Sequence, residues 1–416
     1  MTTPTIHKMK SWLTALACLA LASCVNDKEG DCSPVAPSES DIWLSVSIHN
    51  LATFSRADVP ADGEQHPDEA AIDAENYINT SDVNILLFDK DKRLIRTFDN
   101  SSYTLTPQAA GVYNLSVKAS SEYFSYAGTA DNTIIDCSVM VVANLNGTGV
   151  GDGPFEFNNS EMIFKPLAAL SGLYRGFPYT GAVGAAAWEP AVDSRLIPMS
   201  GIATASFTRA DLNAATTEAA ALKLPTIYIQ RAMAKVRLIN AIQGSDYEIT
   251  SVTLSGTNTR GTYLPLLTDS SPWAENTAVI EYGTARAAWY DAVTPLPSAQ
   301  VRYTDALNLV GNGTGQQYDA YRVYVPEFDW DVIGTNPGPT LNITVRSTKD
   351  NSTQNFTYAF PRTAKNNAGH EIPGDFARNH IYQVAVTGVS TTQPVTLQTF
   401  YTVCPWSTRS TDIEFN

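Results

Sequence analysis

Apolar and polar residues alternate along many short segments of this chain. At residues 42–48 and again at 341–345, every second side chain is apolar, which is the pattern of a β-strand with one buried and one solvated face. Further strand-like segments recur at 83–88, 112–117, 138–142, 226–229, 234–239, 247–254, 321–325, 356–360, 382–386 and 397–403. Clusters rich in glycine and asparagine separate several of them, at 144–153, 311–315 and 366–369. The pattern predicts antiparallel strands joined by polar turns.

Helical periodicity is confined to residues 210–221 and 161–173. Many short strands with few helices favour an all-β fold built from antiparallel β-sandwiches. The length exceeds what a single hydrophobic core usually serves. We therefore predict two tandem sandwich domains, at 57–218 and 219–416, with the boundary at the polar, alanine-rich segment 211–221.

The first residues have the pattern of a secretion signal. Basic side chains at His7, Lys8 and Lys10 precede an apolar run at 12–22, which is too short to cross a bilayer as a permanent helix. The end of the run and the two residues after it read Leu-Ala-Ser-Cys, with the cysteine at Cys24, which is the pattern of a bacterial lipobox. We expect residues 1–23 to be a signal peptide removed by lipoprotein signal peptidase, and Cys24 to carry lipid, including palmitate. An ordinary signal peptide with a chance cysteine is the alternative.

Charge and apolar runs limit what the rest of the chain binds. No later stretch reaches the eighteen or so apolar residues of a membrane span, so the only membrane contact we expect is the lipid. Residues 57–416 carry 23 basic and 37 acidic side chains, a net charge of −14 against −15 for the whole chain. An acidic surface of this kind disfavours nucleic acid as a partner.

The five cysteines do not form a disulfide framework. Cys18 leaves with the signal peptide and Cys24 is consumed by lipid, so Cys32, Cys137 and Cys404 remain. Cys137 and Cys404 are a possible pair if Cys32 is also cut away. Two separate buried thiols in strands is the favoured interpretation.

Motifs that could carry chemistry fail on spacing. The glycine-rich stretch at 147–153 has Asp152 where a dinucleotide fingerprint requires glycine, and no helix is predicted after it. Residues 89–93 alternate carboxylates as a calcium loop does, but lack its central glycine and closing glutamate, and predict a hairpin turn between strands. His370 is followed by glutamate, yet Pro373 breaks the helix that a zinc-protease motif needs.

No serine stands in a nucleophile-elbow sequence either. We expect no catalytic residues, no metal and no cofactor, and therefore no enzyme. An active site assembled from residues distant in sequence is the alternative that such motif reasoning leaves open.

Eight short motifs follow one another in a characteristic order along the chain. After the lipobox ending at Cys24 come FSRAD at 54–58, DVNILLFD at 82–89, VMVVAN at 139–144, IPMSG at 197–201, QRAMAKV at 230–236, ARNHIY at 377–382 and VCPW at 403–406. The set resembles the Bacteroidales fimbrillin superfamily, the major and minor fimbrial subunit proteins of Porphyromonas and Bacteroides, also called type V pilins. The resemblance implies transthyretin-like sandwiches and a structural role in a pilus that supports adhesion.

The resemblance also implies a route to the cell surface. Members of the family are exported as lipoproteins to the outer membrane and cut there by an arginine-specific protease, and Arg56-Ala57 matches such a site. Residues 24–56 would then be a lipidated propeptide whose strand, with Ile42, Leu44, Val46 and Ile48 pointing inward, is removed on maturation. Loss of a strand exposes an unpaired sheet edge that demands a replacement.

The replacement implied by the family is a donated C-terminal strand. The tail from 394 onward supplies an alternating run, and the candidate donor residues are Leu397, Phe400, Tyr401, Val403 and Trp406. Head-to-tail donation does not close on itself, so it yields a homo- or heteropolymeric filament of pilus subunits at the cell surface.

Other roles stay open at this point. Asp31-Cys32 is reminiscent of anchor subunits, which keep their lipid, whereas Arg56-Ala57 favours a polymerising stalk or tip subunit. A tip adhesin would bind a host receptor or glycan. A surface glycan-binding lipoprotein, a function of another class, would stack sugars on aromatic rings such as Trp273, Trp289 and Trp330. Protease-dependent polymerisation separates that monomer from a pilus subunit.

Overall fold

The fold is given by a computed structural model that describes residues 41–50, 75, 77–109, 112–144, 196–242, 244, 246–257, 307–311, 320–328, 338–365, 371–390 and 396–405. All of them belong to one compact unit, Ser40–Asn416. Several predictions fall outside the described residues: the lipobox and Cys24, Cys32, the Arg56-Ala57 site, the helix at 161–173, the glycine-rich stretch at 147–153, the three tryptophans, His370 and Trp406.

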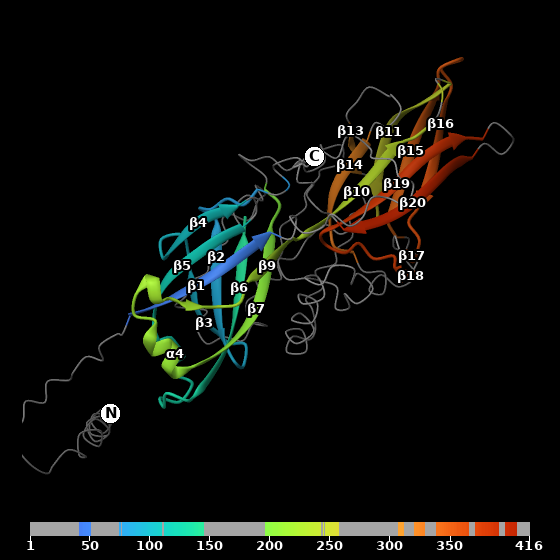
Figure 1. The fold of residues 1–416 in the computed structure, drawn as a ribbon. Helices are drawn as coiled ribbons and strands as arrows, with labels where there is room; N and C mark the ends of the chain where they lie inside the picture. Colours follow the sequence, from blue (N-terminus) through green and yellow to red (C-terminus); the bar gives the residue numbers. More distant parts are fainter. Residues whose placement is uncertain are drawn as a thin grey trace, which may run out of the picture. The chain divides into compact units, whose positions relative to one another are not determined.

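The first part of the chain forms a nine-stranded sheet (Figure 1). Its strands are β1 (Asp41–Asn50), β2 (Val83–Asp89), β3 (Leu94–Phe98), β4 (Tyr103–Ala109), β5 (Val112–Ser120), β6 (Ile134–Ala143), β7 (Met199–Thr208), β8 (Leu222–Lys223) and β9 (Ile227–Arg231). They are ordered β3-β2-β6-β7-β9-β1-β5-β4, with β8 paired to β1. One core cluster unites inward residues of β1 and β5 with those of β2 and β6, so the two halves of the sheet pack face to face.

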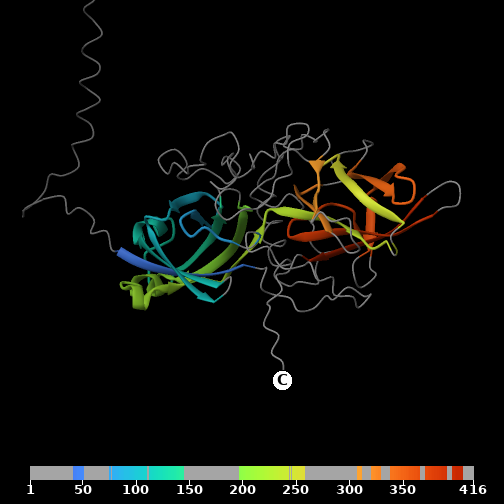
Figure 2. The same ribbon diagram turned by 90° about the horizontal axis from the view of Figure 1, so that it is seen from above.

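The later strands form a second sandwich (Figure 2). They are β10 (Met233–Asn240), β11 (Tyr247–Ser255), β12 (Leu307–Asn308), β13 (Val310–Gly311), β14 (Ala320–Pro326), β15 (Thr340–Ser347), β16 (Thr353–Ala359), β17 (Thr363–Lys365), β18 (Glu371–Pro373), β19 (His380–Val389) and β20 (Leu397–Pro405). A sheet ordered β13-β14-β10-β19-β20 packs on a sheet ordered β12-β11-β15-β16, while β17 and β18 pair as a separate ribbon.

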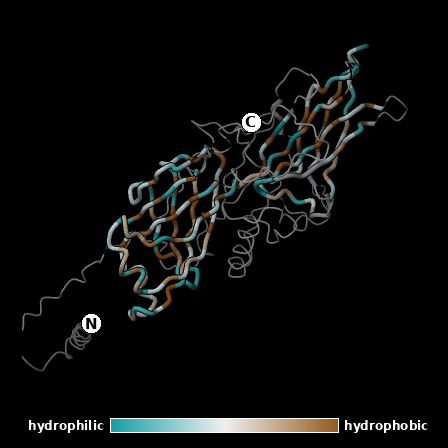
Figure 3. Tube along the Cα trace, in the orientation of Figure 1, coloured by the Kyte–Doolittle hydropathy of each residue, from teal (hydrophilic) through white to brown (hydrophobic). Residues whose placement is uncertain are grey.

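The all-β prediction is confirmed. Hydrophobic and hydrophilic residues alternate along many of the strands (Figure 3), as expected where one face of a sheet is buried. Each predicted strand segment overlaps a strand of the structure. Within the described residues, no helix is both long enough and apolar enough to span a bilayer.

Strand partners change at Ala232, between β9 and β10. β8 and β9 follow residue 219, yet they pair with β1 and β7 of the first sheet. From Met233 onward the strands pair among themselves. The division into domains at 218 and 219 stays a prediction, and the sheets themselves change later in the chain.

The helix expected at 210–221 is shorter than predicted and is followed by a separate turn. Helix α4 (Arg209–Ala214) starts with a capping box, in which Thr208 and Asp211 each bond the other's backbone N–H. It ends at Ala214 with Ala215 as its C-cap, and a 3₁₀ turn, η5 (Glu218–Ala220), follows with Thr217 as its N-cap. A second 3₁₀ turn, η2 (Ser121–Phe124), follows β5.

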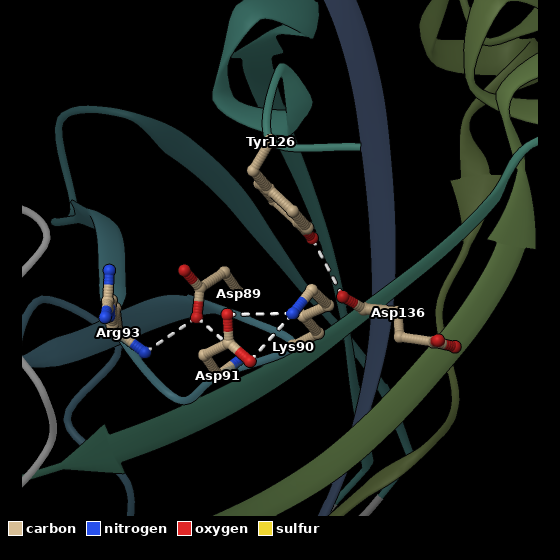
Figure 4. Close-up of polar contacts among 6 residues, drawn as sticks. All are labelled: Asp89, Lys90, Asp91, Arg93, Tyr126 and Asp136. Atoms are coloured by element: carbon tan, nitrogen blue, oxygen red, sulfur yellow. Dashed lines mark hydrogen bonds and ion pairs between the residues drawn. The ribbon is translucent and has the colours of Figure 1, made fainter. Parts of the chain in front are cut away.

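The predicted turn at 89–93 joins β2 to β3 (Figure 4). The carboxylate of Asp89 accepts hydrogen bonds from the backbone N–H groups of Asp91 and Arg93, at 2.9 and 2.8 Å. Lys92 adopts a left-handed conformation, with φ of 61°. The aspartate side chain is thus occupied in closing the turn. Among the described residues, no group of three or more His, Cys, Asp or Glu side chains could hold a metal ion.

Candidate assembly site

Strand β1 lies inside the first sheet. It pairs antiparallel with β5 along its length, from Asp41 opposite Ser120 to His49 opposite Val112. On its other side it runs parallel to β8 and β9. Two further bonds hold it, from the N–H of Trp43 to the Ala215 carbonyl and from the N–H of Leu224 to the Ser45 carbonyl, both 2.8 Å. Removing this strand would therefore leave unpaired backbone groups on β5, β8 and β9.

The inward face of β1 is as predicted from the alternation. Ile42, Leu44, Val46 and Ile48 are only 1–2% exposed and belong to the first core cluster. Burial at about 1.5–3 kcal/mol for each side chain contributes on the order of 6–10 kcal/mol. A one-residue slip would turn serine side chains inward in their place, so the register is strongly specified.

Strand β20, which contains the candidate donor residues other than Trp406, is held differently. It pairs antiparallel with β19, with Tyr401 opposite Val384 and Leu397 opposite Val389, and the register shifts between Val386 and Gly388. It stands at the edge of its sheet in the described structure. An edge strand with one described partner depends on fewer backbone bonds than the internal strand β1.

The candidate donor side chains do not share one face of β20. Leu397 and Tyr401 are half-buried and pack against the second core, whereas Phe400 is 59% exposed. The intervening side chains, Gln398 and Thr399, are exposed too. The side chain of Val403 lies outside the described residues. Alternation along a strand places neighbouring residues on opposite faces, which explains why Phe400 and Tyr401 are separated.

Tyr401 contributes an aromatic contact to this strand. Its ring meets Phe360 edge to face, with centroids 5.6 Å apart, and Tyr358 at 6.2 Å. Its hydroxyl oxygen is buried and has no hydrogen-bond partner. Burial, followed by the neighbouring Tyr358, raises the pKa of Tyr401 well above its ordinary value. Tyr401 is therefore a neutral phenol whose polar group is unsatisfied.

The motifs that carry the family resemblance meet in buried polar clusters. In one cluster, the guanidinium of Arg231 donates to the Glu75 carbonyl at 2.9 Å and to the Asn379 side chain at 2.7 Å. The Glu75 carboxylate accepts from the Lys235 ammonium at 2.8 Å and from the Tyr324 hydroxyl at 2.5 Å. These bonds join residues that lie before β2, at the end of β9, on β10 and β14, and before β19.

Charge balance keeps this cluster ionised. Burial raises the pKa of Glu75, but attraction and hydrogen bonds from Lys235, with Tyr324 and Arg231, outweigh it, so the net shift is downward. Burial lowers the pKa of Arg231 to about 10 against the attraction of Glu75, which leaves the side chain cationic at neutral pH. Buried charges of this kind are stable only with their partners present.

A second cluster surrounds Arg378, ahead of β19. Its guanidinium donates to the Glu327 carboxylate at 2.7 Å, with both side chains 4% exposed, and approaches the Ser200 hydroxyl at 3.4 Å. The ring Nδ1 of His380 lies 2.8 Å from the Arg378 carbonyl oxygen. Burial lowers the pKa of His380 to about 4 against the hydrogen bond and the charge of Glu327. His380 is therefore neutral at physiological pH.

A third motif residue, Asn144, closes the end of β6. Its side-chain amide donates to the carbonyls of Ile197 and Tyr77, at 2.8 and 2.9 Å, and its oxygen accepts from the Asn79 N–H at 2.9 Å. The residue has a positive φ of 63°, which asparagine tolerates better than most residues. Sequence reasoning assigned no role to these polar side chains, although their position inside apolar motifs is the signal of buried polar residues that must find partners.

Cys137 is a free, buried thiol on β6. The favoured interpretation, a separate thiol in a strand, is confirmed for this residue, whereas the side chain of Cys404 lies outside the described residues. Burial, with a smaller effect of Asp136, raises the pKa of the Cys137 thiol to about 12. A thiol so rarely ionised is a poor nucleophile.

Comparison with known proteins gives matches among solved structures alone. No family model and no curated protein match the chain. The tip fimbrial protein Mfa3 from Porphyromonas gingivalis, with C-terminal truncation, has 11% identity and a TM-score of 0.43, over 88% of this chain and all of that chain. A fimbrial assembly protein from Parabacteroides distasonis has 14% identity and a TM-score of 0.40, over 86% of this chain and all of that one.

A third structure, described as a proposed cell adhesion protein of Parabacteroides distasonis, has 13% identity and a TM-score of 0.45, over 88% of this chain and 97% of that chain. These structures belong to the same class of proteins that the motifs resemble.

Proposed function

We propose that this chain is a structural pilus subunit that supports adhesion. It is exported as a lipoprotein, cut after Arg56 and polymerised head to tail by strand exchange. The observation that supports this most directly is the contrast between β1 and β20. The first is an internal strand with four fully buried side chains, and the second is an edge strand with half-buried and exposed ones.

The contrast gives each strand a part in assembly. While β1 is covalently attached, its pairing with β5, β8 and β9 keeps the first sandwich complete and the precursor monomeric. Cleavage after Arg56 cuts the chain beyond the end of β1, so that the strand can leave. The vacated groove then accepts a strand from the C-terminal tail of another subunit.

Lipid carries the precursor to its place of assembly. In the proposal, lipoprotein signal peptidase exposes Cys24, lipid on its sulfur holds the precursor at the outer membrane, and an arginine-specific protease releases residues 24–56. The mature subunit, residues 57–416, then belongs to a cell-surface fimbrium. Labelled palmitate appearing on a Cys24→Ala variant would contradict this anchor.

The test is to mix purified precursor with an arginine-specific protease and follow particle size by chromatography and electron microscopy. We expect filaments from the wild-type chain. Arg56→Ala and a chain lacking residues 396–416 should both remain monomeric, the first because β1 stays attached and the second because no donor remains.

Two outcomes would contradict the proposal. Filaments formed equally well by either variant would exclude strand exchange by this route. A wild-type chain that is cut at Arg56 and stays monomeric would favour a lipid-anchored glycan-binding protein. Tip and anchor subunits differ from a stalk subunit in the number of neighbours that they bind, so they would cap or start filaments rather than extend them.

A further inference from the structure

The hydroxyl of Tyr401 is an exception among the buried tyrosines of the second sandwich. The hydroxyl of Tyr321 donates to the Ile249 carbonyl at 2.7 Å, and that of Tyr382 accepts from the Ala377 N–H at 2.5 Å. Both rings stand on strands inside the sheet, β14 and β19. Tyr401 buries its hydroxyl without any such partner, and it stands on the edge strand β20.

An unpartnered hydroxyl weakens the attachment of the strand that bears it. In water the group is hydrogen-bonded, so burial forfeits those bonds and release restores them. The other described side chains of β20 offer little compensation. Leu397 is half-buried, while Gln398, Thr399 and Phe400 are exposed. The backbone ladder with β19 and the Tyr401 ring are thus the main described contacts of the strand.

We propose that the buried hydroxyl of Tyr401 is a built-in destabilising group that sets how readily β20 leaves its own sheet, and hence how fast a subunit donates it. The donation step rests on the proposed function, whereas the release of β20 does not. The ring keeps β20 in register against Phe360, and the hydroxyl limits how firmly it is held. A subunit can then shield its tail as a monomer and still give it up to an open groove.

The first test measures release in the uncleaved precursor, where no exchange between subunits takes place. Tyr401→Phe keeps the ring and removes the hydroxyl. A buried polar group without a partner costs about 1–3 kcal/mol, so amide hydrogens of β20 should exchange at least about fivefold more slowly in the variant. Tyr358→Phe is the matched control. This variant removes the hydroxyl of the neighbouring ring, and that hydroxyl is not one of the buried groups without a partner. Amide hydrogen exchange in β20 should therefore be unchanged.

The second test follows polymerisation after cleavage. If release of β20 limits donation, Tyr401→Phe should slow filament growth by the same factor as amide exchange, and Tyr358→Phe should not. Unchanged or faster β20 exchange in Tyr401→Phe would overturn the inference, whatever happens to the filaments. Slower exchange with unchanged growth would instead show that release of β20 does not limit donation, which overturns the proposed link between the hydroxyl and the rate of assembly and leaves its role in strand release intact.

Discussion

At the scale of single residues, the motifs of this chain specify polar groups that satisfy one another inside an apolar core. Arg231 is fully buried and Arg378 nearly so, and each guanidinium has a carboxylate, carbonyl or amide partner. Such groups cost free energy wherever a partner is missing. The sequence showed where these residues stand, but not their partners, because the partners come from segments as much as 178 residues apart.

Removing the carboxylate that neutralises Arg378 tests this dependence. Glu327→Gln leaves the guanidinium buried beside a neutral amide, and the free energy of unfolding should fall by about 3–5 kcal/mol, measured by urea denaturation. Lys349→Gln is the control, because Lys349 and Asp246 form an exposed pair and its loss should leave the midpoint unchanged. A loss in Glu327→Gln no larger than that of the control would show that other groups suffice to neutralise Arg378.

His380 should make the stability depend on pH. Its folded-state pKa of about 4 lies below the ordinary value of 6.5, so the unfolded chain binds the proton more readily. The stability from the neutral ring is complete above about pH 6.5 and is lost as the pH falls toward 4, by about 3 kcal/mol in total. Urea denaturation between pH 7.5 and 4.5 should show a shallower decline in His380→Gln than in the wild type. Parallel curves would exclude His380 as the cause.

At the scale of elements, alternation was a reliable guide where the alternating residues are large, and it failed where they are small. Strand β7 was not predicted because its sequence mixes small and polar residues, yet it pairs with β6 along its whole length. Gly201 shows why a small residue is needed there, since a Cβ atom would lie 2.1 Å from the Tyr228 carbonyl oxygen. The close approach of β7 and β9 is a tertiary contact, which the local sequence pattern does not predict.

Strand β4 was missed for another reason. It contains Pro107, which lacks an N–H group and argues against a central strand. The structure places β4 at the edge of the sheet, where only one side needs backbone donors, and the register shifts between Pro107 and Ala109. The helix expected at 210–221 is also shorter than predicted, because Thr217 caps a separate 3₁₀ turn. The existence of β4 thus depends on its place at the edge of the sheet, and the end of the helix depends on the capping of the next turn.

The inward face of β1 permits a sharp test of that element. Leu44→Ala should destabilise the uncleaved precursor by about 2–5 kcal/mol, because it removes a fully buried side chain between β5 and β8. Ser45→Ala changes the opposite face of the same strand and should alter stability by less than about 0.5 kcal/mol. Equal effects of the two variants, measured by chemical denaturation, would show that β1 does not bury this face in solution.

At the scale of the whole molecule, the sequence predicted the class of fold but not where the sheets change. The alanine-rich segment at 211–221 was a reasonable boundary, because it is polar and separates two strand-rich parts. In the structure, β8 and β9 follow that segment in the chain, yet β8 pairs with β1 and β9 pairs with β7. These pairings arise between strands far apart in the sequence, and β1 runs parallel to both β8 and β9, a geometry that local periodicity does not encode.

The proposed assembly has a direction, since the groove belongs to the first sandwich and the donor to the end of the chain. Arg56→Ala retains a donor strand but keeps its groove filled by β1, while the chain lacking residues 396–416 opens its groove on cleavage but has no donor. Each alone should stay monomeric. Mixed with an arginine-specific protease, they should form heterodimers that contain one copy of each and grow no further, because neither end of the pair can bind again. Mass determination by light scattering distinguishes the outcomes. Longer polymers would show that a second strand can be donated, and an absence of dimers would show that a subunit must itself be cut before it can donate.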